Sequence, residues 1–486
     1  MTEPKNTRPP VLGGGSYAPL RVEMDIHDCV IEGQLPSDLS GGFYAVGPDT
    51  QYPLVPGNIL FDGEGHVRMF RIKDGRADYR SRYARTERYI AQDKARRLLM
   101  PMYRNPDLDD PSVKGLSRST ANTHVINHRN LILALKEDSP PTALDLNTLE
   151  TVDPVYTFGG ELPRTQPFTA HPKVCSTTGN IVAFGYEAKG FGSDVVALFE
   201  LDKTTGKKVW GTEITVPYVG LLHDFAVTEN HIVIFVVPLA IDYEQMKRGG
   251  IHWSWDKNRR TYFGILRRHG DGKDLQWIEG PCRSGTHTMG AFEDGNRIYL
   301  DTEITYGSPF PFMPNKDGSP PDIPGSISRL HRLSANLSGR NKGYEMEQLF
   351  PLIAPLPKQD DRYNTMPYRY GYAGCPDPDV EDKATARSCY ARVDVQTRKY
   401  DLWRAEPGTS LAEPVFAPKN AKAREGEGYL LGVAYHMNEG RRSDLVVLDA
   451  EHVAAGPIAR VRLPVQASPQ VHGWWVREDQ YPDNRS

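Results

Sequence analysis

One short unit recurs along the chain: an apolar strand-like segment, then an aspartate, then a polar turn. Residues 144–148 (LDLNT) share this order with residues 201–206 (LDKTTG), and residues 393–397 (VDVQT) and 448–450 (LDA) repeat it further on. Repetition of strand and turn units around an axis is how β-propellers are built. The recurring unit therefore predicts a radially repeated sheet.

Short strand-like segments, bounded by Gly, Asn, Asp or Pro, occupy much of the remaining sequence. They cover residues 67–72, 76–83, 131–135, 143–146, 180–184, 195–201, 231–237, 297–301, 390–395, 429–434 and 445–449. The chain has 44 glycines and 39 prolines in 486 residues, above the usual ~7% and ~5%, which agrees with many turns. The predicted class is all-β. Seven blades would take about 69 residues each, against ~40–45 in a compact propeller repeat, so the surplus is expected in loops on one face.

Helical signal is sparse, and the best helix candidate is Thr86–Met102, which is stopped by Pro101. No Gly/Ser linker divides the chain, so residues 1–486 are predicted to form one domain. Gly13–Gly15 lie in a polar N-terminal stretch. Residues 1–16 are therefore predicted to be a flexible tail and not a phosphate-binding loop.

Composition and missing motifs exclude several classes of protein. A net charge of −4 with both signs scattered does not give the basic face of a nucleic-acid-binding protein. The longest nearly apolar run, Ile232–Ile241, is shorter than the ~20 residues of a transmembrane helix, and Met1–Pro10 lacks the apolar core of a signal peptide. Five widely spaced cysteines without a C-x-x-C pair favour free thiols in a reducing cytoplasm. No dinucleotide or P-loop glycine pattern appears, so no NAD or flavin is expected.

Four of the 14 histidines stand where an apolar strand meets a turn or a small residue: His171, His223, His287 and His472. In a repeated sheet, spacings of one or a few blades would bring such residues to a common axis. Four imidazoles without a carboxylate suit Zn, Cu, Fe or Ni, and outer carboxylates could orient the rings. A lone histidine in a β-protein is nevertheless most often a surface or core residue. Most of the other ten histidines are expected to lie at the surface. They are His27, His66, His124, His128, His231, His252, His269, His331, His436 and His452.

Several motifs resemble the carotenoid cleavage oxygenase superfamily, over nearly the whole chain. In chain order they are Gly41–Tyr44 with Gly47-Pro48, Phe61–Gly65, Ala170–Pro172, His223–Phe225 and His472-Gly473. The resemblance implies a seven-bladed β-propeller with loops and short helices forming a cap over an axial metal site. It also implies one Fe(II) per chain, held by the four histidines, with O₂ as co-substrate and no haem.

Other motifs are similar to the branch of that superfamily that cleaves stilbenes and related phenylpropenes: Met102–Pro106, Ser112–Leu116, Ala121–Thr123 and Leu135–Asp138. In that branch a Tyr and a Lys bind the 4-hydroxyl of the substrate, a Phe packs on its ring, and a Thr lies beside the open metal position. By resemblance, Tyr103, Lys136 and Phe61 would bind substrate, and Tyr103, Lys136 and Thr123 would be catalytic. From the residues alone, such a lysine is usually solvated and such a tyrosine is usually a core residue.

Three glutamates of the family orient three of the metal histidines. Glu137 and Glu413 match two of them. The position of the third holds Pro355, so a water or a backbone carbonyl is expected to accept the Nδ1–H of His287.

The resemblance implies a non-haem Fe(II) dioxygenase that cleaves the Cα=Cβ bond of 4-hydroxylated stilbenes, of the resveratrol or lignostilbene type, into two aromatic aldehydes. Lys136 would favour the phenolate by charge pairing, and the 4-oxide would enrich the alkene for attack by oxygen.

Alternatives stay open on the same scaffold: cleavage of an isoeugenol-type phenylpropene or of an apocarotenoid, or a non-catalytic propeller that serves as a binding platform. Tyr103 and Lys136 argue against carotenoids, which lack a phenol. The expected partner is a small aromatic alkene, and a homodimer is left open. Phe310–Pro314 is predicted either as a lip of the substrate tunnel or as a packed loop between blades.

Overall fold

The computed structural model describes residues 19–338, 343–380, 387–438 and 442–482. The predicted tail, residues 1–16 with Gly13–Gly15, lies outside these described residues. The described chain consists mostly of short antiparallel strands with a few short helices, which confirms the predicted all-β class.

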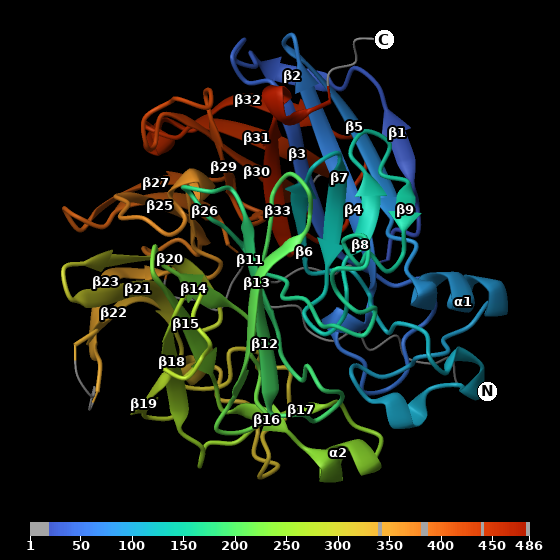
Figure 1. Cartoon of the computed structure of the whole chain (residues 1–486). Coiled ribbons are helices and arrows are strands. Elements are labelled where there is room, and N and C mark those ends of the chain that lie inside the picture. The colour runs from blue at the N-terminus through green and yellow to red at the C-terminus, as the bar shows by residue number, and fades with distance from the viewer. Residues whose placement is uncertain (1–18, 339–342, 381–386, 439–441, 483–486) are drawn as a thin grey trace.

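Seven antiparallel sheets, here called blades 1 to 7, form a ring (Figure 1), which confirms the seven-bladed β-propeller. Blade 1, from its outer edge inward, contains β1 (Met24–Ile26), β5 (Arg76–Tyr83), β4 (Glu64–Lys73), β3 (Gly41–Asp49) and β33 (His472–Arg477). Blade 2, from the inner strand outward, contains β6 (His124–His128), β7 (Leu131–Leu135), β8 (Thr142–Asp145) and β9 (Thr151–Asp153). Blade 3 contains β10 (Lys173–Val174), β11 (Ile181–Gly185), β12 (Val195–Leu201) and β13 (Lys208–Thr215).

The remaining four blades follow the same order around the ring. Blade 4 contains β14 (Phe225–Val227), β15 (His231–Val236), β18 (Thr261–Arg267) and β19 (Gln276–Gly280). Blade 5 contains β20 (Thr288–Asp294), β21 (Arg297–Ile304), β22 (Arg329–Asn336) and β23 (Glu345–Ile353). Blade 6 contains β24 (Lys358–Gln359), β25 (Tyr370–Cys375), β26 (Cys389–Asp394) and β27 (Lys399–Arg404). Blade 7 contains β28 (Thr409–Leu411), β29 (Val415–Pro418), β30 (Gly428–His436), β31 (Arg442–Asp449), β32 (Pro457–Arg462) and β2 (Val30–Gly33).

Strands from distant parts of the chain close the ring twice. The early strand β2 pairs with β32 at the outer edge of blade 7, where Val30 lies opposite Arg462. The late strand β33 pairs with β3 in blade 1, where His472 lies opposite Val46. The ring therefore cannot open without breaking one of these hydrogen-bonded ladders.

The aspartates of the recurring unit shape the turns that follow their strands. Asp145, Asp202 and Asp394 each accept hydrogen bonds from the backbone N–H groups two and three residues later, at 2.7–3.0 Å. Such Asx turns satisfy backbone donors at the point where the ladder ends. The repeat read from the sequence is therefore a repeated turn, and it occurs in blades 2, 3 and 6.

The apolar core lies between the faces of neighbouring blades. In one cluster, Leu133 and Leu135 of blade 2 pack with Ala183 and Phe199 of blade 3. Because both faces of each blade are covered, central strands such as β11 and β30 are buried along their whole length. Outer strands such as β13 are mostly exposed instead, and charged side chains there protect the free edges.

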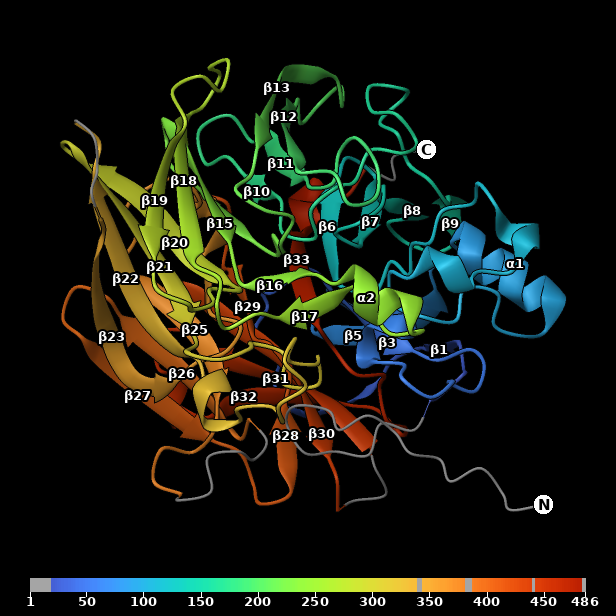
Figure 2. The ribbon, with the colours of Figure 1, turned by 90° about the horizontal axis from the view of Figure 1, so that it is seen from below.

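Two short α-helices and an extra hairpin extend from the ring. They are α1 (Glu87–Ala95), α2 (Tyr243–Lys247) and the pair β16 (Leu239–Ile241) with β17 (Trp253–Trp255). All of them gather in the lower part of Figure 1, and Figure 2, seen from below, shows β16 and β17 beside α2 near the middle of the view. The 3-10 helices of the described chain span Leu60–Asp62, Pro106–Leu108, Pro111–Val113, Pro324–Ser326, Asp361–Tyr363, Val453–Ala455 and Glu478–Gln480. In the described segments, no helix has the length and hydropathy needed to span a lipid bilayer.

The predicted helix Thr86–Met102 begins correctly but ends too late. Thr86 caps the N-terminus by accepting the N–H of Tyr89, and the helix ends at Ala95. Arg96 adopts a left-handed φ of 55°, and the side chain of Gln92 then accepts the backbone N–H of Leu99 at 3.0 Å. This contact turns the chain back well before Pro101, which is why the proline is not the stop signal.

Candidate active site

The inner strand of every blade presents a polar residue at, or one or two positions before, its first residue. From blade 1 to blade 7 these are His472, His124, His171, His223, His287, Lys358 and Glu413. Because consecutive blades repeat the same up-and-down order, these starting points meet at one level of the propeller axis. Six of these residues, all except His223 of blade 4, line one small axial cavity. His223 contacts two of them, His171 and His287.

Four of these histidines form one compact cluster. The ligand atoms of His171, His223, His287 and His472 all lie within 4.8 Å of one another, and all four residues are buried. Nε2 of His223 lies 3.1 Å from Nε2 of His171 and 3.0 Å from Nε2 of His287. The structure thus brings together the four histidines that the sequence singled out.

Carboxylates hold the far nitrogen of three of the rings. Nδ1–H of His223 donates to Glu137 at 2.6 Å, and Nδ1–H of His472 donates to Glu413 at 2.8 Å. Burial opposes ionisation of Glu137, but the attraction of His223 and Lys136 outweighs it and lowers the pKa of this carboxyl group. Such bonds fix the tautomer and the orientation of each imidazole.

The expectation for His287 is wrong. Its Nδ1–H donates to Glu303 at 2.5 Å, and not to a water or a backbone carbonyl. Glu303 lies on β21, directly across the ladder from the start of β20, and its backbone N–H bonds to the carbonyl of His287 at 3.1 Å. A carboxylate from the same blade therefore supplies what Pro355 does not. Sequence reasoning missed Glu303 because a bulge near Met289 shifts the register of this hairpin.

The donor set fits one divalent cation. Burial, reinforced by the neighbouring imidazoles, lowers the pKa of His171 and of His472 well below the usual value, which keeps these rings neutral. A neutral ring that donates from Nδ1 carries a lone pair on Nε2, and within the described residues Nε2 of His472 has no hydrogen-bond partner. Two nitrogens about 2.1 Å from one ion and at right angles lie about 3 Å apart, which agrees with the observed spacing. The cluster is therefore a four-histidine metal site.

Most of the other histidines do not lie at the surface. Six are buried: His66, His124, His128, His252, His331 and His436. The expectation failed because charged or turn neighbours in sequence do not decide burial where both faces of a blade are covered. His124 is the most relevant, since its ring lies 5.1 Å from that of His472 while its Nδ1 bonds to the carbonyl of Ala170 at 2.8 Å.

Lys136 and Tyr103 lie together beside Glu137. Nζ of Lys136 is 4.8 Å from the centre of the Tyr103 ring, and the hydroxyl of Tyr103 donates to Glu137 Oε1 at 3.5 Å. Both side chains are buried. Burial, and then the charge of Glu137, raise the pKa of Tyr103 well above its usual value, so it stays a hydrogen-bond donor. The other oxygen of Glu137 holds His223, so one carboxylate joins this pair to the metal site.

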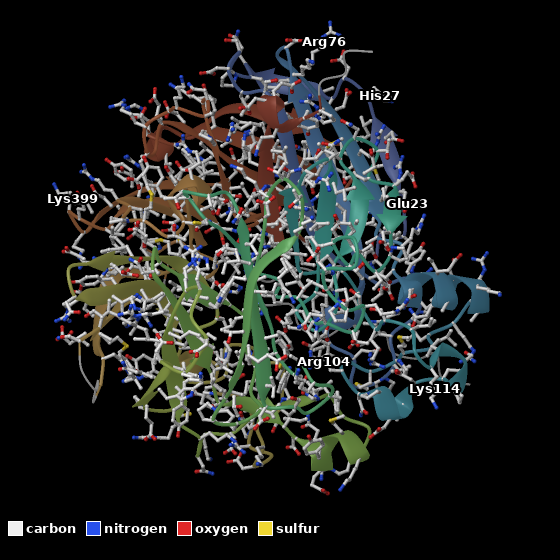
Figure 3. The ribbon with its side chains drawn as sticks, in the orientation of Figure 1. Glu23, His27, Arg76, Arg104, Lys114 and Lys399 are labelled. Carbon is white, nitrogen blue, oxygen red and sulfur yellow. The ribbon has the colours of Figure 1, made fainter. Side chains whose placement is uncertain are left out.

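A buried ion network, which sequence reasoning missed, surrounds this pair. Arg104 contacts Asp138 at 3.0 Å and also pairs with Glu187. It donates to the hydroxyl of Tyr186 at 3.1 Å, and Tyr186 in turn donates to Glu137 at 3.4 Å. Figure 3 labels Arg104 in the lower part of the molecule, near β17, whereas the other labelled charged residues lie at its periphery. Through Arg104 and Tyr186, this network links Glu187 to Glu137, the carboxylate that holds His223.

An aromatic cluster adjoins the metal site. The ring of Phe61 lies 5.8 Å from Tyr103 and 5.5 Å from both Phe310 and Phe312. Phe310 also lies 5.9 Å from the ring of His223. The segment Phe310–Pro314 thus packs beside the metal site, and its role as a lip of the substrate tunnel stays a prediction.

Thr123 is buried next to His124 in the chain. Its hydroxyl donates to the side chain of Asn122 at 3.1 Å, and Asn122 in turn holds the backbone carbonyl of Phe61 at 3.0 Å. Asn122 therefore links the side chain of Thr123 to the backbone of Phe61.

Comparisons with known proteins agree with this geometry. Residues 17–477 match the family described as Retinal pigment epithelial membrane protein. A lignostilbene-α,β-dioxygenase isozyme III of Sphingomonas paucimobilis is 37% identical, over 96% of this chain and 97% of its own length. An isoeugenol monooxygenase of Pseudomonas putida is also 37% identical, over 95% of this chain and 97% of its own length.

A solved structure supports the same relationship. The crystal structure of a lignostilbene dioxygenase of Pseudomonas brassicacearum superposes with a TM-score of 0.90 at 36% identity, and covers 94% of this chain and 96% of the other. With a matching family over almost its whole length, a seven-bladed propeller and four converging histidines, the chain belongs to the carotenoid cleavage oxygenase family and is a double-bond-cleaving oxygenase.

Proposed function

We propose that the chain is an Fe(II) dioxygenase that cleaves the Cα=Cβ bond of 4-hydroxylated stilbenes into two aromatic aldehydes. The observation that carries the proposal is the pairing of Lys136 with Tyr103 beside Glu137, the carboxylate that orients His223. A buried ammonium group and a neutral phenol donor suit recognition of a substrate phenol. Their place next to the metal site suits a substrate whose alkene is conjugated to that phenol.

Lys136 and Tyr103 bind the 4-hydroxyl group through different interactions. The ammonium group of Lys136 stabilises the phenolate form by charge. Tyr103, whose pKa is raised by burial and by Glu137, stays protonated and donates a hydrogen bond to the phenolate oxygen. The negative 4-oxide pushes electron density through the ring into the alkene, which activates it for oxidation.

The four histidines would hold the iron through Nε2, and Fe(II) supplies the electrons that let triplet O₂ react with a singlet alkene. Glu137, Glu303 and Glu413 fix three of the rings and balance the positive charge of the ion. Imidazole ligands alone also suit Zn and Cu, but Zn²⁺ has no redox chemistry and cannot supply these electrons.

Aromatic side chains favour a flat substrate next to the metal. Phe61 forms edge-to-face contacts with Phe310 and Phe312 and also contacts Tyr103. Such rings bind an aromatic ligand through stacking and burial. Phe61 is the residue we assign to the phenol ring itself. We assign to Thr123 a position beside the open metal site, on the basis of its place between Asn122 and His124.

An aerobic assay of the Fe(II)-loaded protein tests the proposal. Resveratrol, a lignostilbene and isoeugenol are supplied, and aldehyde formation is followed. The 4-O-methyl ether of each substrate is the matched control, because it keeps the carbon skeleton and the oxygen but removes the ionisable proton. Rapid cleavage of the free stilbene phenols, with little turnover of the ethers, is expected. Equal cleavage of the ethers and the phenols would contradict the proposed role of Lys136 and Tyr103 in recognising the phenol.

A one-ring phenylpropene of the isoeugenol type is the second candidate substrate. It is favoured by the equal identity, 37%, to an isoeugenol monooxygenase. The phenol-binding pair suits both substrates, since both carry a 4-hydroxyl group. The ratio of kcat/KM for the stilbene and for isoeugenol decides between them.

A further inference from the structure

Three polar side chains form a closed triangle beside the metal site. Lys173, Asp224 and Thr288 stand one or two residues after three of the four metal-site histidines. Nζ of Lys173 lies 2.7 Å from Asp224 Oδ1 and donates to the hydroxyl of Thr288 at 3.0 Å. Oδ2 of Asp224 accepts both the backbone N–H and the hydroxyl of Thr288, each at 2.8 Å. One edge of this triangle is therefore an ion pair, and the other two are hydrogen bonds.

The triangle joins three blades at the place where the histidines meet. The inner strands β10, β14 and β20 belong to three separate sheets and are not paired with one another in a ladder. The spacing of the histidines at their starting ends therefore depends on contacts between blades. Asp224 supplies such a contact in two directions at once, with its side chain only 3% exposed. Charge-assisted bonds of this kind are short and geometrically demanding.

His171 depends on this arrangement more than the other three histidines do. Glutamates hold Nδ1 of His223, His287 and His472, but within the described residues no carboxylate accepts a hydrogen bond from Nδ1 of His171. The backbone N–H of His171 bonds to the hydroxyl of Thr169 at 3.0 Å. On the other side of the histidine, the chain is tied to its neighbours through Lys173.

We propose that Asp224 is a positioning residue for the metal site. Through its contacts with Lys173 and Thr288, it sets the distances between the chain segments that carry His171, His223 and His287. Its oxygens bond to Lys173, Thr288 and the N–H of Phe225, so it acts through the ligands and not on the metal. The role depends only on the four-histidine site and applies whichever alkene is cleaved.

The test measures the metal site directly. Metal-free wild-type protein and the variants Asp224→Asn, Lys173→Met and Thr288→Val are titrated with Co²⁺, and the visible absorption bands of the bound ion are recorded. Loss of an outer partner of a metal ligand typically costs 10–100-fold in affinity. We expect a loss of this size for Asp224→Asn, with changed band positions at saturating Co²⁺, and smaller losses for the other two variants. The band positions report ligand geometry, which a purely structural role would leave unchanged.

Glu200→Gln is the matched control. Glu200 is 2% exposed, bonds to Asn180 of blade 3 and pairs with Arg268, which follows the last residue of β18 in blade 4. It therefore links two of the same blades without touching the metal site, and its variant should keep the wild-type Co²⁺ affinity and spectrum. Wild-type affinity and bands in Asp224→Asn would overturn the proposal, as would an equal loss in Glu200→Gln. If Asp224→Asn does not fold, the same criteria apply to Lys173→Met and Thr288→Val.

Discussion

Glu303 faces His287 across the ladder of β20 and β21 and accepts the hydrogen bond from its Nδ1 at 2.5 Å. The hydroxyl of Thr286 donates to the same carboxylate oxygen. Burial opposes ionisation of Glu303, but His287 and its other donors outweigh it and lower the pKa of this carboxyl group. A negative charge is thus present behind the metal ligand, although Pro355 stands where the family places a glutamate.

Replacing Glu303 should weaken metal binding. Glu303→Gln keeps an oxygen that can accept the Nδ1–H but removes the charge, so metal affinity is expected to fall 10–100-fold. The dissociation constant for Fe(II) or Co²⁺ measures the effect. Glu345→Gln is the control, because Glu345 lies in the same blade, pairs with Arg297 and is 76% exposed. Unchanged affinity in Glu303→Gln would mean that this carboxylate does not support the site.

The place of Glu303 could not be read from the sequence because the β20–β21 register is irregular. Counting back from the turn, Asp294 pairs with Arg297, and this spacing would place Ile304 opposite His287. The bulge near Met289 shifts the pairing by one residue, so Glu303 takes that place instead. A shift of one residue also changes the face on which a side chain lies, and nothing in the sequence marks this bulge.

Features carried by local sequence were predictable, and features carried by contacts between distant segments were not. The turn aspartates and the four histidines each stand in a recognisable local pattern, which a repeated fold then brings to one axis. The pairing of Arg104 with Glu187, 83 residues away, depends on how the segment between α1 and β6 packs against blade 3. Likewise His124 has an ordinary local context, and only the common starting level of the inner strands makes it a neighbour of His472.

Removing the charge of Lys136 should affect phenolic substrates selectively. Lys136→Met retains the length of the side chain and loses the ammonium group, so kcat/KM for a 4-hydroxystilbene is expected to fall about 10²–10³-fold, as when a donor to a developing anion is lost. Tyr103→Phe should cost about 10–100-fold, because it removes a hydrogen bond to an anionic oxygen. Steady-state kinetics on the phenol and its methyl ether measure both effects. The ether rate should hardly change in either variant, and an equal loss on both substrates would contradict the role.

Removal of the metal should abolish activity and lower stability. Neutral Nε2 lone pairs 3.0–3.1 Å apart repel one another in the absence of a cation, and a ligand that binds only the folded state stabilises it. At one hundred times the dissociation constant the gain is about 2.7 kcal/mol. Protein treated with a chelator should be inactive and unfold at lower urea concentration, and Fe(II) should restore both properties. Zn²⁺ should restore stability without activity, and recovery of activity with Zn²⁺ would contradict the need for iron.

Asp62, next to Phe61, should make stability depend on pH. Burial raises its pKa to about 6, although Arg88 opposes the shift, and the unfolded value is about 3.9. Because the folded state binds the proton more tightly, stability falls as pH rises from about 4 through 6. Between pH 5 and pH 7 this loss is about 1.4 kcal/mol. Asp62→Asn should remove it, so the free energy of unfolding of the variant minus that of wild type should rise by this amount. Urea unfolding at both pH values measures the difference, which would stay constant if Asp62 did not titrate.

Arg104 should keep Asp138 from drawing the ammonium group of Lys136 away from the substrate. The carboxylate of Asp138 lies 3.0 Å from Arg104 and 3.8 Å from Lys136, so the two cations share it. In Arg104→Gln the carboxylate loses one of its cations and attracts Lys136 more strongly, so the ammonium group is drawn away from the phenolate. We expect KM for a 4-hydroxystilbene to rise about tenfold, equivalent to about 1.4 kcal/mol, with metal content unchanged. Adding Asp138→Asn in that background removes the competing charge and should restore most of the KM. If the double variant binds substrate as weakly as Arg104→Gln, the loss comes from the local fold around Arg104 and not from competition for Lys136.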